Sequence, residues 1–112
     1  MITTSRVAIW TVALAAALFL LLPSYSLAAD DAASLYNTKC AACHGADGAG
    51  KPAAKIPSLI SDEAKNMPDT GLTDAIANGG SNKKATHAFQ AKGMTPDQIK
   101  MVLSYIRGLQ KK

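Results

Sequence analysis

Five consecutive residues, Cys40-Ala41-Ala42-Cys43-His44, constrain this 112-residue chain more than any other feature, and they contain both of its cysteines. Two cysteines separated by two residues and followed directly by histidine form the attachment signature of c-type haem. Sulfurs at this spacing match the two vinyl groups of one porphyrin, and the adjacent histidine reaches the iron from one face. We therefore expect one haem c per chain, with Cys40 and Cys43 as covalent thioethers and His44 as the proximal axial ligand.

Other chemistries of the same residues fit less well. A thioredoxin-like redox pair belongs near a strand–helix–strand pattern, and none flanks residues 40–44. A structural zinc site needs four ligands, whereas the chain offers only its two cysteines, His44 and His87, two of which are sequence neighbours. A plain structural disulfide would have no use for His44. Haem attachment is therefore the interpretation that we adopt.

The first 28 residues have the three-part pattern of a secretory signal peptide. One basic residue, Arg6, precedes an apolar run over residues 7–22, and small residues at Ser26 and Ala28 follow it. The run of 16 residues is shorter than the roughly 20 that span a bilayer. We therefore expect cleavage after Ala28 and a periplasmic location, with an uncleaved membrane anchor facing the periplasm as the alternative.

Cleavage would leave residues 29–112 as a single small domain of 84 residues. Its 11 Lys and Arg exceed its 8 Asp and Glu by only three, because Arg6 leaves with the signal. This charge is too weak to predict nucleic-acid binding, but a mildly positive face could steer an acidic redox partner. A domain of this size has a modest core and usually needs a staple. We expect covalent haem to be that staple, the apoprotein to be largely unfolded, and the protein to be a monomer.

Helical segments joined by glycine- and proline-rich coil account for the mature chain, and no segment alternates apolar and polar residues over the length of a strand. The first predicted helix begins at an N-cap, Asp31, and runs through residues 32–39 into the haem motif. The other segments are a glycine-rich loop (45–50), an extended coil (51–59), a helical turn (61–66), a short helix (69–78) with Leu72, Ala75 and Ile76 on one face, and an irregular polar stretch (81–93). The pattern predicts an all-α fold.

The last helix is the best-defined element. Thr95 is a natural N-cap, Pro96 suits the first helical position, and Gln98 completes a capping box. Apolar residues then recur at helical spacing, at positions 99, 102, 103 and 106. One face of this helix is therefore expected to pack on the core.

The order of these elements resembles the monohaem class I cytochrome c family of bacteria. The resemblance covers essentially all of residues 30–110. Its specific parts are residues 40–44 and the stretch 98–109, whose Ile-x-x-Val-Leu-x-Tyr-Ile-Arg pattern looks like the closing helix of the family. The resemblance implies a small orthogonal bundle of helices around one covalently attached haem.

The resemblance also implies particular contacts. The first and last helices of the family cross, which here would bring Leu35 and Tyr36 toward Tyr105 and Leu103. The family uses a carbonyl of its proline coil to accept a hydrogen bond from the proximal histidine, and Pro57 matches that segment. Such a bond orients the imidazole and increases its donor strength.

The second axial ligand is where the sequence departs from the family pattern. The family usually places methionine opposite the histidine in a Met-Pro-x-aromatic stretch, but the corresponding stretch here is Thr86-His87-Ala88-Phe89. His87 is the first candidate because neutral imidazole is a good iron ligand, although a lone histidine in a polar loop is often only a surface residue. Met94, which can also form a hydrophobic staple with Ile99, and Met67 are alternatives, and an open site is the remaining one.

These features together predict a one-electron carrier between redox proteins rather than an enzyme. No acid–base constellation flanks the haem motif, and the protein would supply ligands, burial and an exposed haem edge. The alternative is a haem enzyme, or a sensor of gas or peroxide, with an open or weakly ligated distal site. The missing methionine motivates that alternative.

Overall fold

The computed structural model describes the backbone of residues 25–112 and the side chains of residues 31–112. The predicted signal peptide, residues 1–28, lies outside the described part of the chain except for its last four residues, so its cleavage stays a prediction. Over the described residues, no helix combines the length and the apolar character that a membrane crossing requires.

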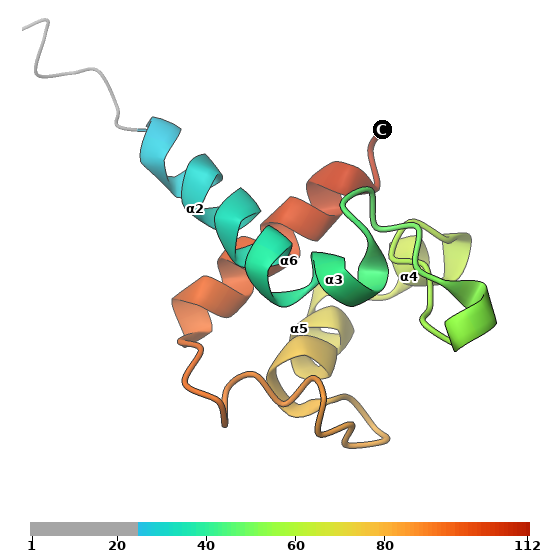
Figure 1. The fold of residues 1–112 in the computed structure, drawn as a ribbon. Helices are drawn as coiled ribbons and strands as arrows, with labels where there is room; N and C mark the ends of the chain where they lie inside the picture. The colour runs from blue at the N-terminus through green and yellow to red at the C-terminus, as the bar shows by residue number, and fades with distance from the viewer. Residues whose placement is uncertain (1–24) are drawn as a thin grey trace, which may run out of the picture.

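Five α-helices and one 3-10 helix form the regular structure of residues 25–112 (Figure 1). In chain order they are α2 (Tyr25–Lys39), α3 (Ala41–His44), η1 (Pro52–Ala54), α4 (Asp62–Asn66), α5 (Asp69–Asn78) and α6 (Pro96–Leu109). The described residues form no strand, only an isolated antiparallel bridge between Lys51 and Ile56. The prediction of an all-α fold is therefore confirmed.

The helix that leads into the haem motif is longer than the sequence indicated. α2 begins at Tyr25, so Asp31 lies inside the helix and is not its N-cap. Residues 25–31 contain neither glycine nor proline, and nothing in them therefore stops the helix from extending toward the N-terminus. At its other end, Lys39 places a positive charge in the last turn, where the helix dipole favours it.

The start of α6 matches the sequence prediction. The Thr95 hydroxyl accepts a hydrogen bond from the backbone N–H of Gln98 (3.2 Å), and the Gln98 side-chain oxygen accepts one from the backbone N–H of Thr95 (2.9 Å). This capping box pairs two donors that the helix itself leaves unpaired. The buried stripe of α6 consists of Ile99, Val102, Ile106 and Leu109, whereas Leu103 is only half-buried.

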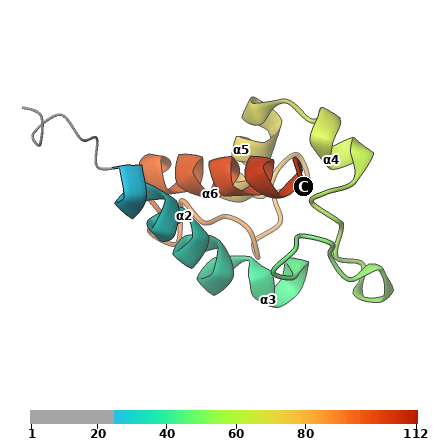
Figure 2. The ribbon, with the colours of Figure 1, turned by 90° about the horizontal axis from the view of Figure 1, so that it is seen from above.

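The core forms where α6 contacts both α2 and α5 (Figures 1 and 2). Its buried members are Tyr36, Ala77, Met94, Ile99, Val102, Ile106 and Leu109. The expected contact between the first and last helices is present, because the rings of Tyr36 and Tyr105 have centroids 4.8 Å apart. Since Tyr36 lies one helical turn before Cys40, this packing fixes the haem motif relative to α6.

A single arginine attaches the α4–α5 corner to α6. The Arg107 guanidinium donates to the carboxylate of Asp69 and to the carbonyls of Ala64, Lys65 and Met67. These three carbonyls belong to the C-terminal end of α4, where a helix leaves its acceptors unpaired. Arg107 therefore closes a helix of only five residues that could not persist alone.

The apolar face of α5 differs slightly from the prediction. Leu72 is buried as expected, but its buried companion is Ala77, whereas Ala75 and Ile76 are half-buried. The helix ends at Asn78, and the residue that caps it, Gly79 (φ 87°), has the left-handed conformation that favours glycine at this position.

Candidate haem-binding site

The Cys-x-x-Cys-His motif lies at the corner between α2 and α3. The backbone N–H of Cys40 donates to the Tyr36 carbonyl (2.8 Å) and that of His44 to the Cys40 carbonyl (2.9 Å), so the turn stays helical through the motif. Cys40 is half-buried and Cys43 is exposed. Burial, followed by the charge of Cys43, raises the pKa of Cys40 to about 11. The Cys40 thiol is therefore protonated at neutral pH.

His44 is the buried histidine of this corner, with 7% of its surface exposed. Its Nδ1 lies 3.0 Å from the carbonyl oxygen of Pro57. A carbonyl can only accept a hydrogen bond, so Nδ1 carries the proton and donates. The lone pair of the imidazole then lies on Nε2, the nitrogen that is free to bind a metal. The contact expected between His44 and Pro57 is thus present in the structure.

The glycine-rich loop, residues 45–50, folds back on His44 and on the proline coil. The carbonyl of Gly45 accepts a hydrogen bond from the Tyr36 hydroxyl (2.8 Å). The carbonyl of Gly48 accepts one from the Leu59 N–H (2.7 Å), and the Gly50 N–H donates to the His44 carbonyl (2.8 Å). The loop therefore joins the motif to both the core and the Pro57 segment.

His87 lies in the irregular stretch between α5 and α6, whose position is set by backbone bonds to α5. The N–H groups of Phe89 and Gln90 donate to the carbonyls of Ile76 and Ala77, at 3.2 and 3.1 Å. These two carbonyls belong to the last turn of α5, which a helix leaves without internal partners. The loop that carries His87 is thus fastened to the end of a helix although it has no regular structure itself.

The structure brings His44 and His87 together. Their ring centroids are 5.8 Å apart, and their planes differ by 19°. Burial, then the charges of His44, Lys84 and Lys92, lower the pKa of His87. The His87 imidazole is therefore neutral at pH 7, with a lone pair to offer.

This pair of histidines fits a haem iron with an imidazole on each side. With metal–nitrogen bonds of about 2 Å, two imidazoles on opposite sides of one metal have centroids about 6 Å apart. The observed separation of 5.8 Å agrees with this arrangement. Among the described residues, no three His, Cys, Asp or Glu side chains are grouped so as to hold a metal ion by themselves. The two histidines and two cysteines are the donor types that an axially ligated haem c would need.

The two methionine alternatives have other surroundings. Met94 is 8% exposed and belongs to the buried core with Ile99, as expected for a hydrophobic staple. Met67 is the C-cap of α4, is half-buried, and lies against Gly71. Each methionine thus has a packing role that explains it without a metal.

Two neighbours of His87 were not anticipated from the sequence. The Phe89 ring lies 6.3 Å from the His87 ring, centroid to centroid. The Lys92 ammonium lies 5.1 Å from the Phe89 ring centroid and donates to the Thr86 carbonyl (3.0 Å). Lys92 thus contacts residues on both sides of His87 in the chain, Thr86 before it and Phe89 after it. The sequence gives no signal for these contacts, because side chains in a loop without a regular period cannot be assigned to a common face.

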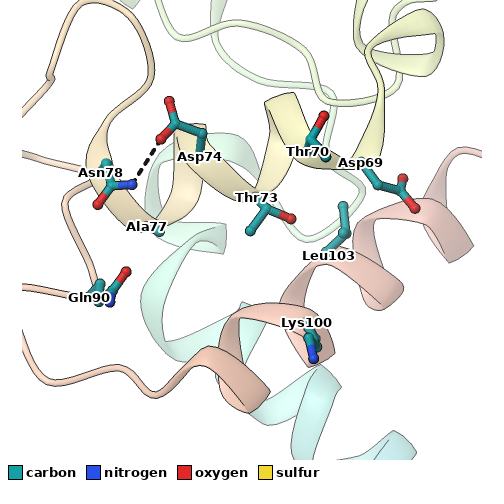
Figure 3. Close-up of a pocket in the computed structure, with 9 residues that line it drawn as sticks. All are labelled: Asp69, Thr70, Thr73, Asp74, Ala77, Asn78, Gln90, Lys100 and Leu103. Atoms are coloured by element: carbon teal, nitrogen blue, oxygen red, sulfur yellow. Dashed lines mark hydrogen bonds between the residues drawn. The ribbon is translucent and has the colours of Figure 1, made fainter.

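A groove between α5 and α6 lies apart from these residues (Figure 3). Its lining residues are Asp69, Thr70, Thr73, Asp74, Ala77, Asn78, Gln90, Lys100 and Leu103. Asp74 and Asn78 are already paired by a hydrogen bond of 2.8 Å. The groove is lined by neither the cysteines nor the histidines of the candidate site.

Comparison with known proteins gives a family match over the segment that contains these residues. The family model described as "Cytochrome C oxidase, cbb3-type, subunit III" matches residues 27–106. The matched segment begins in α2, ends in α6, and contains the motif, Pro57 and His87. No curated protein matches the chain.

Proposed function

Because this chain belongs to the family of c-type cytochrome domains described as subunit III of cbb3-type cytochrome c oxidase, we propose that it is an electron carrier with one covalently attached haem c. The observation that carries the proposal is the pair of nearly parallel imidazoles, with ring centroids 5.8 Å apart, beside the Cys-x-x-Cys-His corner. When bound, haem supplies one-electron exchange between ferrous and ferric iron. The part of this chain is to hold, orient and bury that group.

Four side chains would hold the haem. Cys40, which is half-buried, and Cys43 would form the two thioether bonds. His44 would bind the iron through Nε2, while its Nδ1–H donates to the Pro57 carbonyl. His87 would bind as a neutral imidazole. Two imidazoles generally give a lower reduction potential than histidine with methionine, because imidazole donates more strongly to ferric iron.

The partners that we propose are redox proteins in the periplasm. Three exposed lysines, Lys83, Lys84 and Lys92, lie in the loop that carries His87, and Lys51 donates to the Ala42 carbonyl inside the haem motif (3.0 Å). This local positive charge favours an acidic docking surface on the partner. The family description names an oxidase subunit, so a terminal oxidase is one candidate partner. We propose a monomeric, exported protein, anchored to the membrane only if the signal segment is retained.

The decisive experiment is low-temperature EPR with near-infrared magnetic circular dichroism on the ferric holoprotein. We expect a low-spin spectrum of two imidazoles in the intact protein and its loss in His87→Ala. Because the ring planes differ by only 19°, the EPR signal should be rhombic rather than the strongly anisotropic type given by perpendicular rings. Met94→Leu and Met67→Leu are the matched controls, and both should keep the spectrum of the intact protein.

Other results would replace this proposal. A methionine charge-transfer band that survives His87→Ala, and that one of the two methionine variants removes, would transfer the ligand role to that methionine. High-spin iron in the intact protein would indicate an open distal site. The haem enzyme or sensor of gas or peroxide would then be the better account.

A further inference from the structure

Gly50, the last glycine of the loop after the haem motif, has no room for a side chain. A Cβ atom added there would lie 2.6 Å from the carbonyl oxygens of both Ile56 and Pro57 and 2.7 Å from the Pro57 carbonyl carbon. These neighbours are backbone atoms, so they cannot rotate away as the end of a side chain would. The hydrogen that glycine carries in that direction is therefore the largest group that fits against the Pro57 carbonyl.

The same carbonyl is the hydrogen-bond acceptor of His44. The Pro57 oxygen lies 3.0 Å from His44 Nδ1, and the Gly50 N–H donates to the His44 carbonyl (2.8 Å). Gly50 thus contacts both partners of the bond, the histidine through its N–H and the acceptor through its α-carbon. A C–H group directed at a carbonyl oxygen is itself a weak donor.

We propose that Gly50 is a positioning residue for the proximal histidine. By admitting the Pro57 carbonyl next to its α-carbon, it sets the length of the His44–Pro57 hydrogen bond and, through that bond, the reduction potential. The inference rests on the proposed function, in which His44 binds the haem iron.

The surroundings of the Pro57 carbonyl explain why a change at Gly50 would alter the His44–Pro57 hydrogen bond. The coil before Pro57 is closed on itself by two backbone bonds, from the Lys51 N–H to the Ile56 carbonyl (3.0 Å) and from the Ile56 N–H to the Lys51 carbonyl (3.1 Å). A methyl group at Gly50 must therefore displace the carbonyl groups of Ile56 and Pro57, and the Pro57 carbonyl is the acceptor. A longer bond leaves Nδ1–H less polarised and the imidazole a weaker donor. Ferric iron is then less stabilised, and the potential rises.

The test compares Gly50→Ala with Gly48→Ala in the haem-loaded protein. The two glycines share a loop and nearly the same strained backbone, with φ of 73° and 75°. A Cβ at Gly48 would approach side chains, the nearest being the terminal methyl of Leu109 at 3.3 Å, and not the Pro57 carbonyl. Backbone strain is therefore common to both variants, and pressure on the acceptor is specific to Gly50.

Two quantities are measured in each variant: the reduction potential and, by NMR of the ferrous state, the exchange rate of the His44 Nδ1 proton. In Gly50→Ala we expect a higher potential and roughly fivefold to tenfold faster exchange, as for one weakened hydrogen bond. In Gly48→Ala we expect both to stay at the values of the intact protein, although both variants lose stability. Equal changes in the two variants, or no change in Gly50→Ala, would overturn the inference.

A measurement on the unmutated protein covers the case in which Gly50→Ala does not fold. Because a Gly50 α-proton and the His44 Nδ1 proton both lie against the Pro57 oxygen, a nuclear Overhauser effect should connect them in the ferrous holoprotein. Its absence contradicts the inference whatever the variant does. Failure of the proposed function looks different, because the purified protein would then lack the mass and the absorption bands of covalent haem.

Discussion

At the scale of single residues, Tyr36 joins the helix packing to the haem motif. Its side chain is fully buried, its ring packs on Tyr105, and its hydroxyl donates to the Gly45 carbonyl, one residue after His44 (2.8 Å). Burial first, then the charges of Cys40, Tyr105 and Asp47, raise the pKa of Tyr36 from 10.0 to about 12. The effect of burial persists when Cys40 becomes a thioether and can no longer ionise.

This pKa predicts a loss of stability in alkali. The folded protein holds the Tyr36 proton more tightly than the unfolded chain does, so the stabilisation is complete below pH 10 and is lost as the pH rises from 10 toward 12. We expect the free energy of unfolding to fall by up to roughly 2 kcal/mol over this range. Denaturant unfolding of the holoprotein at several pH values measures it.

Tyr36→Phe is the control for that titration. It should remove this part of the alkaline loss and cost about 1 kcal/mol at neutral pH for the missing hydrogen bond to Gly45. The same dependence on pH in the variant and in the intact protein would assign the alkaline loss to other groups, such as the lysines.

Sequence and structure also agree unevenly at this scale. Cys40, Cys43 and His44 could be identified from the sequence because the chemistry of attachment dictates their spacing. The role of Gly50 could not, since it depends on how two loops meet, and the sequence records only that a glycine is present. The surroundings of His87 could not be predicted from the sequence either, because Lys92 and Phe89 lie near it through loop contacts that follow no period.

At the scale of elements, α6 was predicted most completely. Its capping box is a local signal within four residues, and its apolar stripe repeats at the helical period, so both can be recognised without knowing the rest of the fold. The predicted start of α2 was wrong because residues 25–31 contain no glycine or proline that would keep the helix from extending beyond Asp31. The predicted apolar face of α5 was incomplete: Leu72 is buried and Ile76 packs against the core as expected, but Ala77 is buried as well. The burial of Ala77 is a tertiary effect that the sequence pattern does not give.

Gly108 provides a test of how far α6 depends on its own helix propensity. It is an exposed residue inside α6, and a Cβ there would meet nothing within 4 Å. Gly108→Ala should therefore stabilise the protein by about 0.5–1 kcal/mol, the usual gain when alanine replaces glycine inside a helix. Thermal unfolding of the holoprotein, monitored by circular dichroism, measures this gain.

Gly93→Ala is the matched control for Gly108→Ala. Its added Cβ also meets nothing within 4 Å, but the backbone of Gly93 has φ of 98°, which alanine tolerates poorly. The two positions have the same space for a methyl group but different backbone conformations. The change in the free energy of unfolding should therefore have opposite signs, with Gly93→Ala destabilising the protein. A loss of stability in Gly108→Ala would mean that this face of α6 has a neighbour that its exposed surface does not show.

At the scale of the whole molecule, the protein core is small for the fold that it supports. Among the side chains of residues 31–112, only Tyr36, Ile99 and Val102 are both large and fully buried. The segment 45–61 follows His44 and has η1 as its only helix, and the segment 79–95, which carries His87, has none. We therefore expect the order of these segments to depend on what the two histidines and two cysteines bind.

The last prediction concerns the chain without covalent haem. Cys40→Ser with Cys43→Ser removes both attachment points and changes little else, because each substitution exchanges sulfur for oxygen on one half-buried and one exposed side chain. A domain with so small a core does not offset the conformational entropy of its loops without a staple. We expect far-ultraviolet circular dichroism to show loss of most helical signal in the double variant and a cooperative thermal transition only in the haem-loaded protein. If the double variant has the same helical signal as the holoprotein and unfolds as cooperatively, this prediction is contradicted. Packing of α2 and α5 on α6 would then be sufficient to fold the chain.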